Sequence, residues 1–248
     1  MELSEAVRAR RMVRTYQPDR PVPRDAISRL LELATRAPSA GFSQGWDFVV
    51  LTEPQDRERY WSAATAGATE SATESATESA TESATESATE ATESGTESGT
   101  EVGTEVGTGA AAPPDRWLAG MRSAPALIVC LSDPNRYLDR YAERDKGWTD
   151  RDEARWPVPY WDVDTGMAAM VLLLGAVDQG LGGCFFGVPI ERTSAVLAAL
   201  SIPADRRLVG VISLGYAAPD RRSPSLRRGR RPVAKVAHDG RFGVPWPA

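Results

Sequence analysis

Residues 37–51 read APSAGFSQGWDFVVL, a loop of mostly small residues followed at once by an apolar run. The run DFVVL at 47–51 has the length and composition of a buried strand. The segment before the loop, 23–37, predicts a helix because Ile27, Leu30, Leu31 and Ala34 recur at helical spacing. The loop is either an ordinary helix-to-strand connection or a place where backbone amides approach a flat ligand.

Further elements alternate on both sides of this stretch. Helices are predicted over 2–10, 54–64, 114–124, 164–179 and 189–200, and strands over 125–132, 182–188 and 206–216. Short strands separated by helices indicate a layered domain of the α/β type. The tail after Tyr216 is rich in Pro and Arg and has no core pattern, so we expect it to wrap over its own domain or a partner subunit.

A tandem tetrapeptide interrupts this pattern. The sequence ATES repeats five times from Ala68 to Ser87 and then degenerates. A period of four places Glu beside Glu at i,i+4, where like charges repel, so a solvated helix is disfavoured. We expect residues 66–112 to be a disordered, low-complexity insertion within a single domain spanning 1–248. The alternative is an interaction protein whose acidic repeat recruits a partner.

The net charge of −5 depends on this repeat. Residues 66–112 hold ten Glu and no Lys or Arg, so the remaining chain carries 29 basic and 24 acidic residues. Seven of the basic residues lie between Arg221 and Lys235. This cluster suits a phosphate-bearing ligand, or it is a solvated basic tail. Nucleic acid is not expected as a partner, because the acidic tract would repel it.

Several kinds of chemistry and location are disfavoured. The single histidine, His238, argues against a Ser–His–Asp nucleophile and a His-rich metal site, so no metal is expected. The segment GLGGCF at 180–185 fails the dinucleotide-binding pattern. Cys130 and Cys184 lie in apolar runs and are expected to be buried free thiols of a reducing compartment. With no secretory signal, and with its longest apolar run (166–177) too short for a bilayer, the chain is expected in the cytoplasm without a membrane.

Two clusters of arginine are the candidate binding groups. Arg10, Arg11 and Arg14 lie in RARRMVRTY at the end of the first helix, and the second cluster is RRGRRP at 227–232. Arginine pairs phosphate oxygens bidentately, so convergence of the two clusters on one phosphate is a reasonable hypothesis.

Five motifs occur in an order that resembles the FMN-dependent nitroreductase family: RRMVRTY, APSAGFSQGWDFVVL, GLGGCFFG, SLGY and RRGRRP. Together they cover nearly the whole chain apart from the repeat. The resemblance implies an α+β fold, a nitroreductase-like sandwich with a mainly antiparallel sheet flanked by helices. It also implies an intertwined homodimer with FMN at the interface.

The resemblance further implies roles for the arginines. Arg10 and Arg11 resemble the phosphate and ribityl contacts, and Arg14 resembles the basic residue near N1 and O2 of the flavin. Arg228 and Arg230 resemble a C-terminal phosphate clamp.

Other cofactor contacts are implied by position in the same way. Pro38, Ser39 and Ala40 would pack on the flavin from the partner subunit, with Gln44 near its polar edge. Backbone at Phe186 and Gly187 would face N5. Met12 and Phe42 complete the implied set, although the family usually has Asn where this chain has Phe42 and Pro where it has Gly45.

The function implied is an FMN-dependent NAD(P)H oxidoreductase with ping-pong hydride transfer through flavin N5 to an aromatic acceptor such as a nitroarene or quinone. In this role Arg14 would tune the flavin. The alternative is a flavin-binding protein of the same fold with a specialised biosynthetic or flavin-consuming role and no NAD(P)H turnover. Four aromatic residues between 146 and 166 either line a pocket for the acceptor or cover the long helix or the dimer interface; they are Trp148, Trp156, Tyr160 and Trp161.

Overall fold

The computed structural model describes residues 1–65, 114–219 and 223–247. The chain divides into two compact units, Met1–Ala218 and Pro219–Ala248, and each is described by itself. The insertion expected over 66–112 lies outside the described residues.

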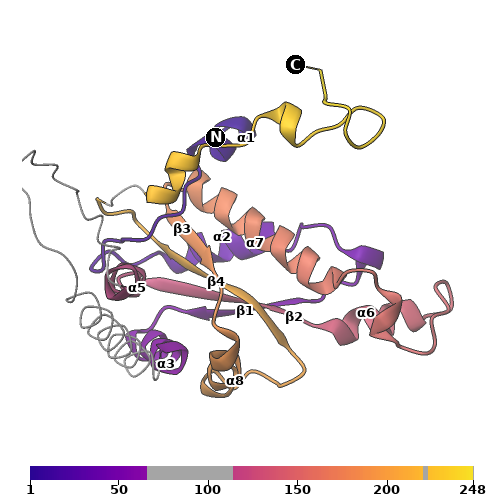
Figure 1. The fold of residues 1–248 in the computed structure, drawn as a ribbon. Helices are drawn as coiled ribbons and strands as arrows, with labels where there is room; N and C mark the ends of the chain where they lie inside the picture. Colours follow the sequence, from indigo (N-terminus) through magenta and orange to yellow (C-terminus); the bar gives the residue numbers. More distant parts are fainter. Residues whose placement is uncertain (66–113, 220–222, 248) are drawn as a thin grey trace, which may run out of the picture. The chain divides into compact units, whose positions relative to one another are not determined.

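The first unit is built on a four-stranded sheet in the order β1-β2-β4-β3 (Figure 1). The strands are β1 (Trp46–Leu51), β2 (Ala126–Ser132), β3 (Gly182–Phe186) and β4 (Arg207–Gly215). Every neighbouring pair is antiparallel. The four predicted strands are confirmed to within two residues at each end, and so is the antiparallel sheet that the family resemblance implied.

Helices cover both faces of the sheet (Figure 1). On one face lie α2 (Arg24–Ala34) and α7 (Tyr160–Asp178), and on the other α3 (Pro54–Thr65), α5 (Pro114–Arg122) and α8 (Ile190–Ala199). A short α1 (Leu3–Ala9) precedes them, and the Met1 amino group pairs with Asp178 at the end of α7 at 2.7 Å.

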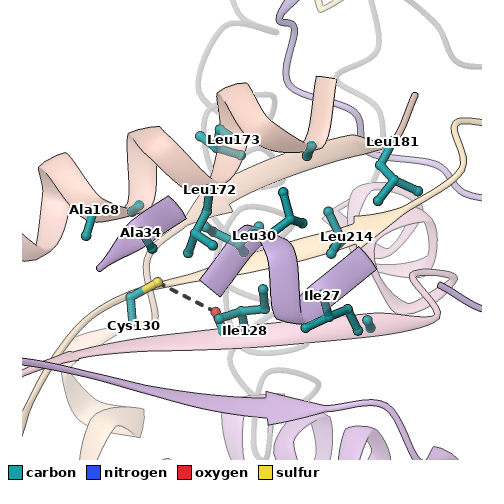
Figure 2. Packing of buried hydrophobic residues seen from close by; sticks show 14 of the residues in the cluster. Ile27, Leu30, Ala34, Ile128, Cys130, Ala168, Leu172, Leu173, Leu181 and Leu214 are labelled. Carbon is teal, nitrogen blue, oxygen red and sulfur yellow. Dashed lines mark hydrogen bonds between the residues drawn. The ribbon is translucent and has the colours of Figure 1, made fainter. Parts of the chain in front are cut away.

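Strand β2 is buried throughout and supplies both cores. Because successive side chains of a strand point to opposite faces, Ile128 and Cys130 enter the core under α2 and α7, while Leu127 and Val129 enter the core under α3, α5 and α8. Figure 2 shows the first core, where Leu30 of α2 and Leu172 of α7 meet Ile128. Burial on both faces explains why the strand reads as one apolar run.

Both cysteines are buried, as expected, and Cys130 is a free thiol. Burial raises the pKa of the Cys130 thiol to about 12, because the thiolate would lose its hydration in the core. These thiols therefore behave as small apolar side chains.

Helix α6 (Pro134–Ala142) was not predicted from the sequence. Only Pro134, Tyr137 and Leu138 of its nine residues are buried, which gives too short an apolar stripe to recognise. Its start is well defined, because the Asp133 carboxylate accepts a hydrogen bond from Asn135 N at 3.0 Å and Pro134 follows the cap.

Helix α7 begins at Tyr160, one turn before the predicted start at Asp164, directly after Pro159. Its 19 residues have the length and hydropathy of a candidate membrane span, and half of that window is buried inside the protein. The buried side packs on α2 and on the sheet, which is the environment of a core helix.

The second unit contains two short 3-10 turns, Pro224–Arg228 and Val233–Lys235, and a bridge between His238 and Pro245. Several of its large apolar side chains are exposed, among them Leu226, Val233, Phe242 and Trp246. The expectation that this tail lacks a core pattern is consistent with that exposure.

Candidate functional site

The N-terminal basic segment follows the edge of the sheet. Val13 N donates to the carbonyl of Gly183 in β3 at 3.1 Å, and Tyr16 forms a bridge with Ala217 after β4. A Cβ on Gly120 of α5 would lie 2.3 Å from the Arg14 carbonyl oxygen, so helix and segment are in close contact. The backbone that carries the arginines is therefore fixed on two sides.

The arginine side chains of this segment are available to a ligand. The guanidinium groups of Arg10, Arg11 and Arg14 form no hydrogen bond or ion pair with any residue of 1–65, 114–219 or 223–247. By contrast, Arg8 Nη1 donates to Ser4 Oγ at 3.5 Å. Three cations within five residues, without anionic partners in the described part of the chain, create a positive region that favours an anion.

The loop between α2 and β1 has an unusual backbone. Gly41, Phe42 and Gln44 adopt φ values of 61°, 58° and 51°. Positive φ is uncommon for residues with a side chain, and such positions concentrate at functional sites. Phe42 is also 78% exposed.

Helices α6 and α7 hold this loop in place. The buried carboxylate of Asp164 in α7 accepts hydrogen bonds from Ala40 N and from the Tyr137 hydroxyl, each at 2.8 Å. Arg140 Nε donates to the carbonyl of Gly41 at 3.0 Å. Burial, and then the bond to Asp164, raises the pKa of Tyr137 well above its ordinary value, so its hydroxyl remains a donor.

Hydrogen bonds within the loop complete the arrangement. Gln44 N donates to Ser39 Oγ at 3.0 Å, and Ser43 Oγ donates to the Ala40 carbonyl at 2.7 Å. The next residue, Gly45, accepts from Asp133 N at 2.9 Å. The loop is thus rigidly bonded although it contains little regular structure.

The end of β3 presents open backbone. The Phe186 ring stacks on Trp61 at a centroid distance of 5.9 Å and meets Trp117 edge-on at 6.0 Å, so its side chain is engaged with α3 and α5. Gly187 is exposed, and a Cβ placed there would meet nothing within 4 Å. Backbone at this strand end can accommodate a flat group.

Within one chain, the loop and the basic segment lie at opposite ends of the sheet (Figure 1). Trp46 pairs with Ser132, which pairs with Arg207 at the start of β4. Gly183, which bonds to Val13, pairs with Leu214 near the end of β4. Strand β4 has nine residues, and at about 3.4 Å per residue its ends are roughly 27 Å apart.

The other predicted residues are distributed as follows. Pro38 is exposed beside the bonded loop, and Met12 is half-buried on β3. Arg228 and Arg230 are exposed and belong to the second unit. Their convergence with the N-terminal arginines stays a prediction.

The four aromatic residues between 146 and 166 belong to a packed aromatic cluster. The Trp156 ring lies within 6.0 Å of five aromatic rings; they are Tyr137, Tyr141, Trp148, Tyr160 and Trp161. A separate hollow of about 630 Å³ has the loop on one side and α6 on the other, and none of the four predicted aromatics lines it. These contacts favour the interpretation in which the aromatics cover the start of the long helix.

Sequence reasoning missed the residues that support the loop, namely Tyr137, Arg140 and Asp164. Asp164 offered a signal, since it is an acidic residue of α7 that comes just before the apolar run 166–177. Its partner Ala40 is 124 positions away in the chain, and no local pattern links them.

An antiparallel four-stranded sheet between two helical layers, with a basic segment beside the edge strand, defines the class of fold. Residues 7–216 match the model of the Nitroreductase family, and the chain belongs to that family.

The chain is also similar to individual known proteins. A protein of Methanothermobacter thermautotrophicus named "Putative NADH dehydrogenase/NAD(P)H nitroreductase" is 25% identical over 221 residues, which cover 88% of this chain and 78% of that protein. Among solved structures, a BluB-like flavoprotein from Clostridium difficile 630 aligns with a TM-score of 0.62 at 17% identity, covering 96% of this chain and 98% of the other. A nitroreductase family protein from Streptococcus pneumoniae aligns with a TM-score of 0.58 at 20% identity, covering 96% and 99%. These structural similarities establish the fold.

Proposed function

We propose that this protein is an FMN-dependent NAD(P)H oxidoreductase that acts as a homodimer on an aromatic acceptor such as a nitroarene or quinone. Membership of the Nitroreductase family supports an oxidoreductase. The name of the Methanothermobacter relative supports NAD(P)H as the donor.

The observation that carries the proposal is a set of arginines on a fixed backbone whose guanidinium groups have no partner among the described residues. Arg10 and Arg11 would bind the phosphate and ribityl chain of FMN, and Met12 would contribute the backbone between them and β3. Arg228 and Arg230 would complete the phosphate site. The residues fit a phosphate-bearing flavin, because cations without partners among the described residues lie near one edge of β3 and open backbone lies at its end.

The separation of the loop from the basic segment supports a site built from two copies of the chain. The two ends of β4 are roughly 27 Å apart, which favours an arrangement in which Ser39 and Arg11 of one chain contact different flavins. In a homodimer, Pro38, Ser39, Ala40, Phe42 and Gln44 of one subunit would reach the flavin held by the other.

Helix α7 provides a surface for such a dimer. Tyr160, Val163 and Met170 are exposed at helical spacing on the side away from the core. Met167 lies between Val163 and Met170, Leu174 lies one turn beyond Met170, and both are half-buried. An apolar stripe of this kind is suited to packing against a second copy.

FMN, when bound, would supply the hydride-transfer chemistry that links NAD(P)H oxidation to reduction of the acceptor in ping-pong turnover. Arg14 would place a positive charge beside the pyrimidine edge, where negative charge develops on reduction. The Phe186–Gly187 backbone would leave room for donor and acceptor to approach in turn.

An anaerobic absorbance spectrum of the purified protein tests this function. We expect a flavin band that bleaches when NADPH or NADH is added and returns when a quinone follows. A flavin band unaffected by both donors would contradict NAD(P)H turnover and support a specialised flavin-binding role. Protein that remains colourless after FMN is supplied would contradict the flavin site.

Arginine variants locate the site. We expect Arg11→Ala to lose FMN on gel filtration at least tenfold more readily than the unaltered protein, since a charge-assisted contact to phosphate is removed. Arg8→Ala is the matched control, because its guanidinium is bonded to Ser4 on the same helix. Equal retention in both variants would contradict the role of Arg11.

A further inference from the structure

Phe42 combines three properties that rarely occur together. It is an aromatic side chain with 78% exposure, it has a left-handed backbone with φ of 58°, and it borders the hollow between the loop and α6. An isolated exposed apolar residue needs no explanation. A strained one in a rigidly bonded loop indicates that its position is used.

Hydrogen bonds fix the loop both before and after Phe42. On one side, Ala40 N is bonded to Asp164 and the Gly41 carbonyl to Arg140. On the other side, Ser43 Oγ donates a hydrogen bond to the Ala40 carbonyl. A ring on such a support loses little entropy when a ligand packs on it, which is the advantage of preorganisation.

The neighbours of Phe42 suit a flat ligand with a polar edge. Ser43 and Gln44 border the same hollow, so two polar residues follow the ring along its edge. Small residues on either side leave the ring unobstructed by bulky neighbours in sequence. Aromatic rings prefer stacked or edge-on partners, so a planar acceptor gains more from Phe42 than a non-planar one.

We propose that Phe42 is a specificity-determining residue that selects flat aromatic acceptors by ring contact, and that Asp164 is a positioning residue that holds Phe42 through the Ala40 amide. The inference rests on the proposed oxidoreductase function and deepens it. It assigns the choice of acceptor to Phe42, a position at which the resemblance implied asparagine.

The test compares two acceptors in steady-state assays of the flavin-loaded dimer with NADPH or NADH. 1,4-Naphthoquinone is planar, whereas ferricyanide has no ring that can stack. We expect Phe42→Ala to raise KM for naphthoquinone about fivefold to tenfold more than KM for ferricyanide, because a weakened flavin contact would affect both acceptors alike, whereas a lost ring contact affects only the planar one. Phe42→Tyr should keep the original selectivity, and Phe42→Leu should lose most of it although its apolar size is similar.

Controls separate this effect from general damage to the protein. Leu33→Ala truncates another exposed apolar side chain, on α2, and should change neither acceptor. A KM for naphthoquinone that Phe42→Ala leaves unchanged, or equal losses for both acceptors, would overturn the proposal while the oxidoreductase function stands. Absence of any NAD(P)H oxidation by the unaltered protein would overturn both.

The role of Asp164 is tested by non-additivity. Asp164→Asn keeps an acceptor oxygen and should preserve most of the selectivity, whereas Asp164→Ala should reproduce the KM effect of Phe42→Ala. The double variant Phe42→Ala/Asp164→Ala should be no less selective than Phe42→Ala alone, because both act through one contact. Should Asp164→Ala not fold, Tyr137→Phe removes one bond to the same carboxylate and should shift selectivity in the same direction. Additive losses, or no loss in Tyr137→Phe and Asp164→Ala, would overturn the positioning role.

Discussion

Gly45 illustrates how one residue connects the loop to the sheet. A Cβ at this position would lie 2.4 Å from Tyr137 Cε2 and 2.8 Å from the Asp133 carbonyl oxygen. Both neighbours are themselves fixed, since Tyr137 bonds to Asp164 and Asp133 caps α6. The departure from proline, which the family resemblance implied here, has a physical reason in this close approach to α6.

Gly45→Ala should therefore destabilise the protein by about 1–3 kcal/mol, because the ring and a backbone carbonyl cannot both move away. The measurement is the free energy of unfolding from urea titration. Gly166→Ala in α7 is the control, since a Cβ there meets nothing within 4 Å and alanine favours helix. A Gly45→Ala variant as stable as this control would show that α6 can shift to accommodate the added Cβ at little cost in free energy.

Among the elements, α6 contributes more to the candidate site than its short length suggests. It supplies Tyr137 and Arg140 to the loop, and a Cβ on Gly41 would lie 2.7 Å from the Tyr141 ring. Its first turn depends on Asp133, which is 4% exposed and also pairs with Arg206 at 3.1 Å. Loss of this cap would destabilise the start of α6, the helix that supplies Tyr137 and Arg140 to the loop.

Asp133→Ala should cost about 1–3 kcal/mol, because it removes a helix cap and the most buried of the three carboxylates that pair with Arg206. Asp133→Asn should cost about half as much, since its side-chain oxygen can still cap Asn135 N. Thermal and urea unfolding of both variants provide the comparison. Equal losses of unfolding free energy in Asp133→Ala and Asp133→Asn would show that the ion pair with Arg206 accounts for the whole effect and the helix cap for none of it.

In the molecule taken as a unit, Met1–Ala218 holds the two groups of residues required by the proposed flavin site far apart from each other. The basic segment and the bonded loop lie at the two ends of a sheet whose strand β4 spans roughly 27 Å over nine residues. The exposed residues of α7 offer a surface for a second copy between these ends. Dimerisation would then be a condition for activity as well as for stability.

Met170→Glu should weaken the proposed dimer at least tenfold, because it places a charge in the middle of the apolar stripe of α7. Sedimentation equilibrium measures the dissociation constant, and FMN retention should fall in parallel. Gln55→Glu adds the same charge on α3 and should leave both unchanged. A Met170→Glu protein that remains dimeric would exclude α7 as the main contact.

Elements whose signal is local can be predicted from the amino-acid sequence alone. The buried strands follow from short apolar runs, and α2 from the spacing of Ile27, Leu30 and Leu31, because backbone periodicity reaches only a few residues along the chain. Burial of Cys130 and Cys184 follows from the same runs. The positions of Arg10, Arg11 and Arg14 as candidate groups could also be read directly.

The contacts between these elements, in contrast, could not be predicted before the fold was known. The antiparallel order of the strands, the bond between Ala40 and Asp164, and the packing of Trp156 against α6 each join residues far apart in sequence. Such contacts depend on which surfaces become buried together, and no local pattern encodes that choice. For the same reason, the sequence named Phe42 as a departure, and only the fold placed it on a strained loop held from two helices.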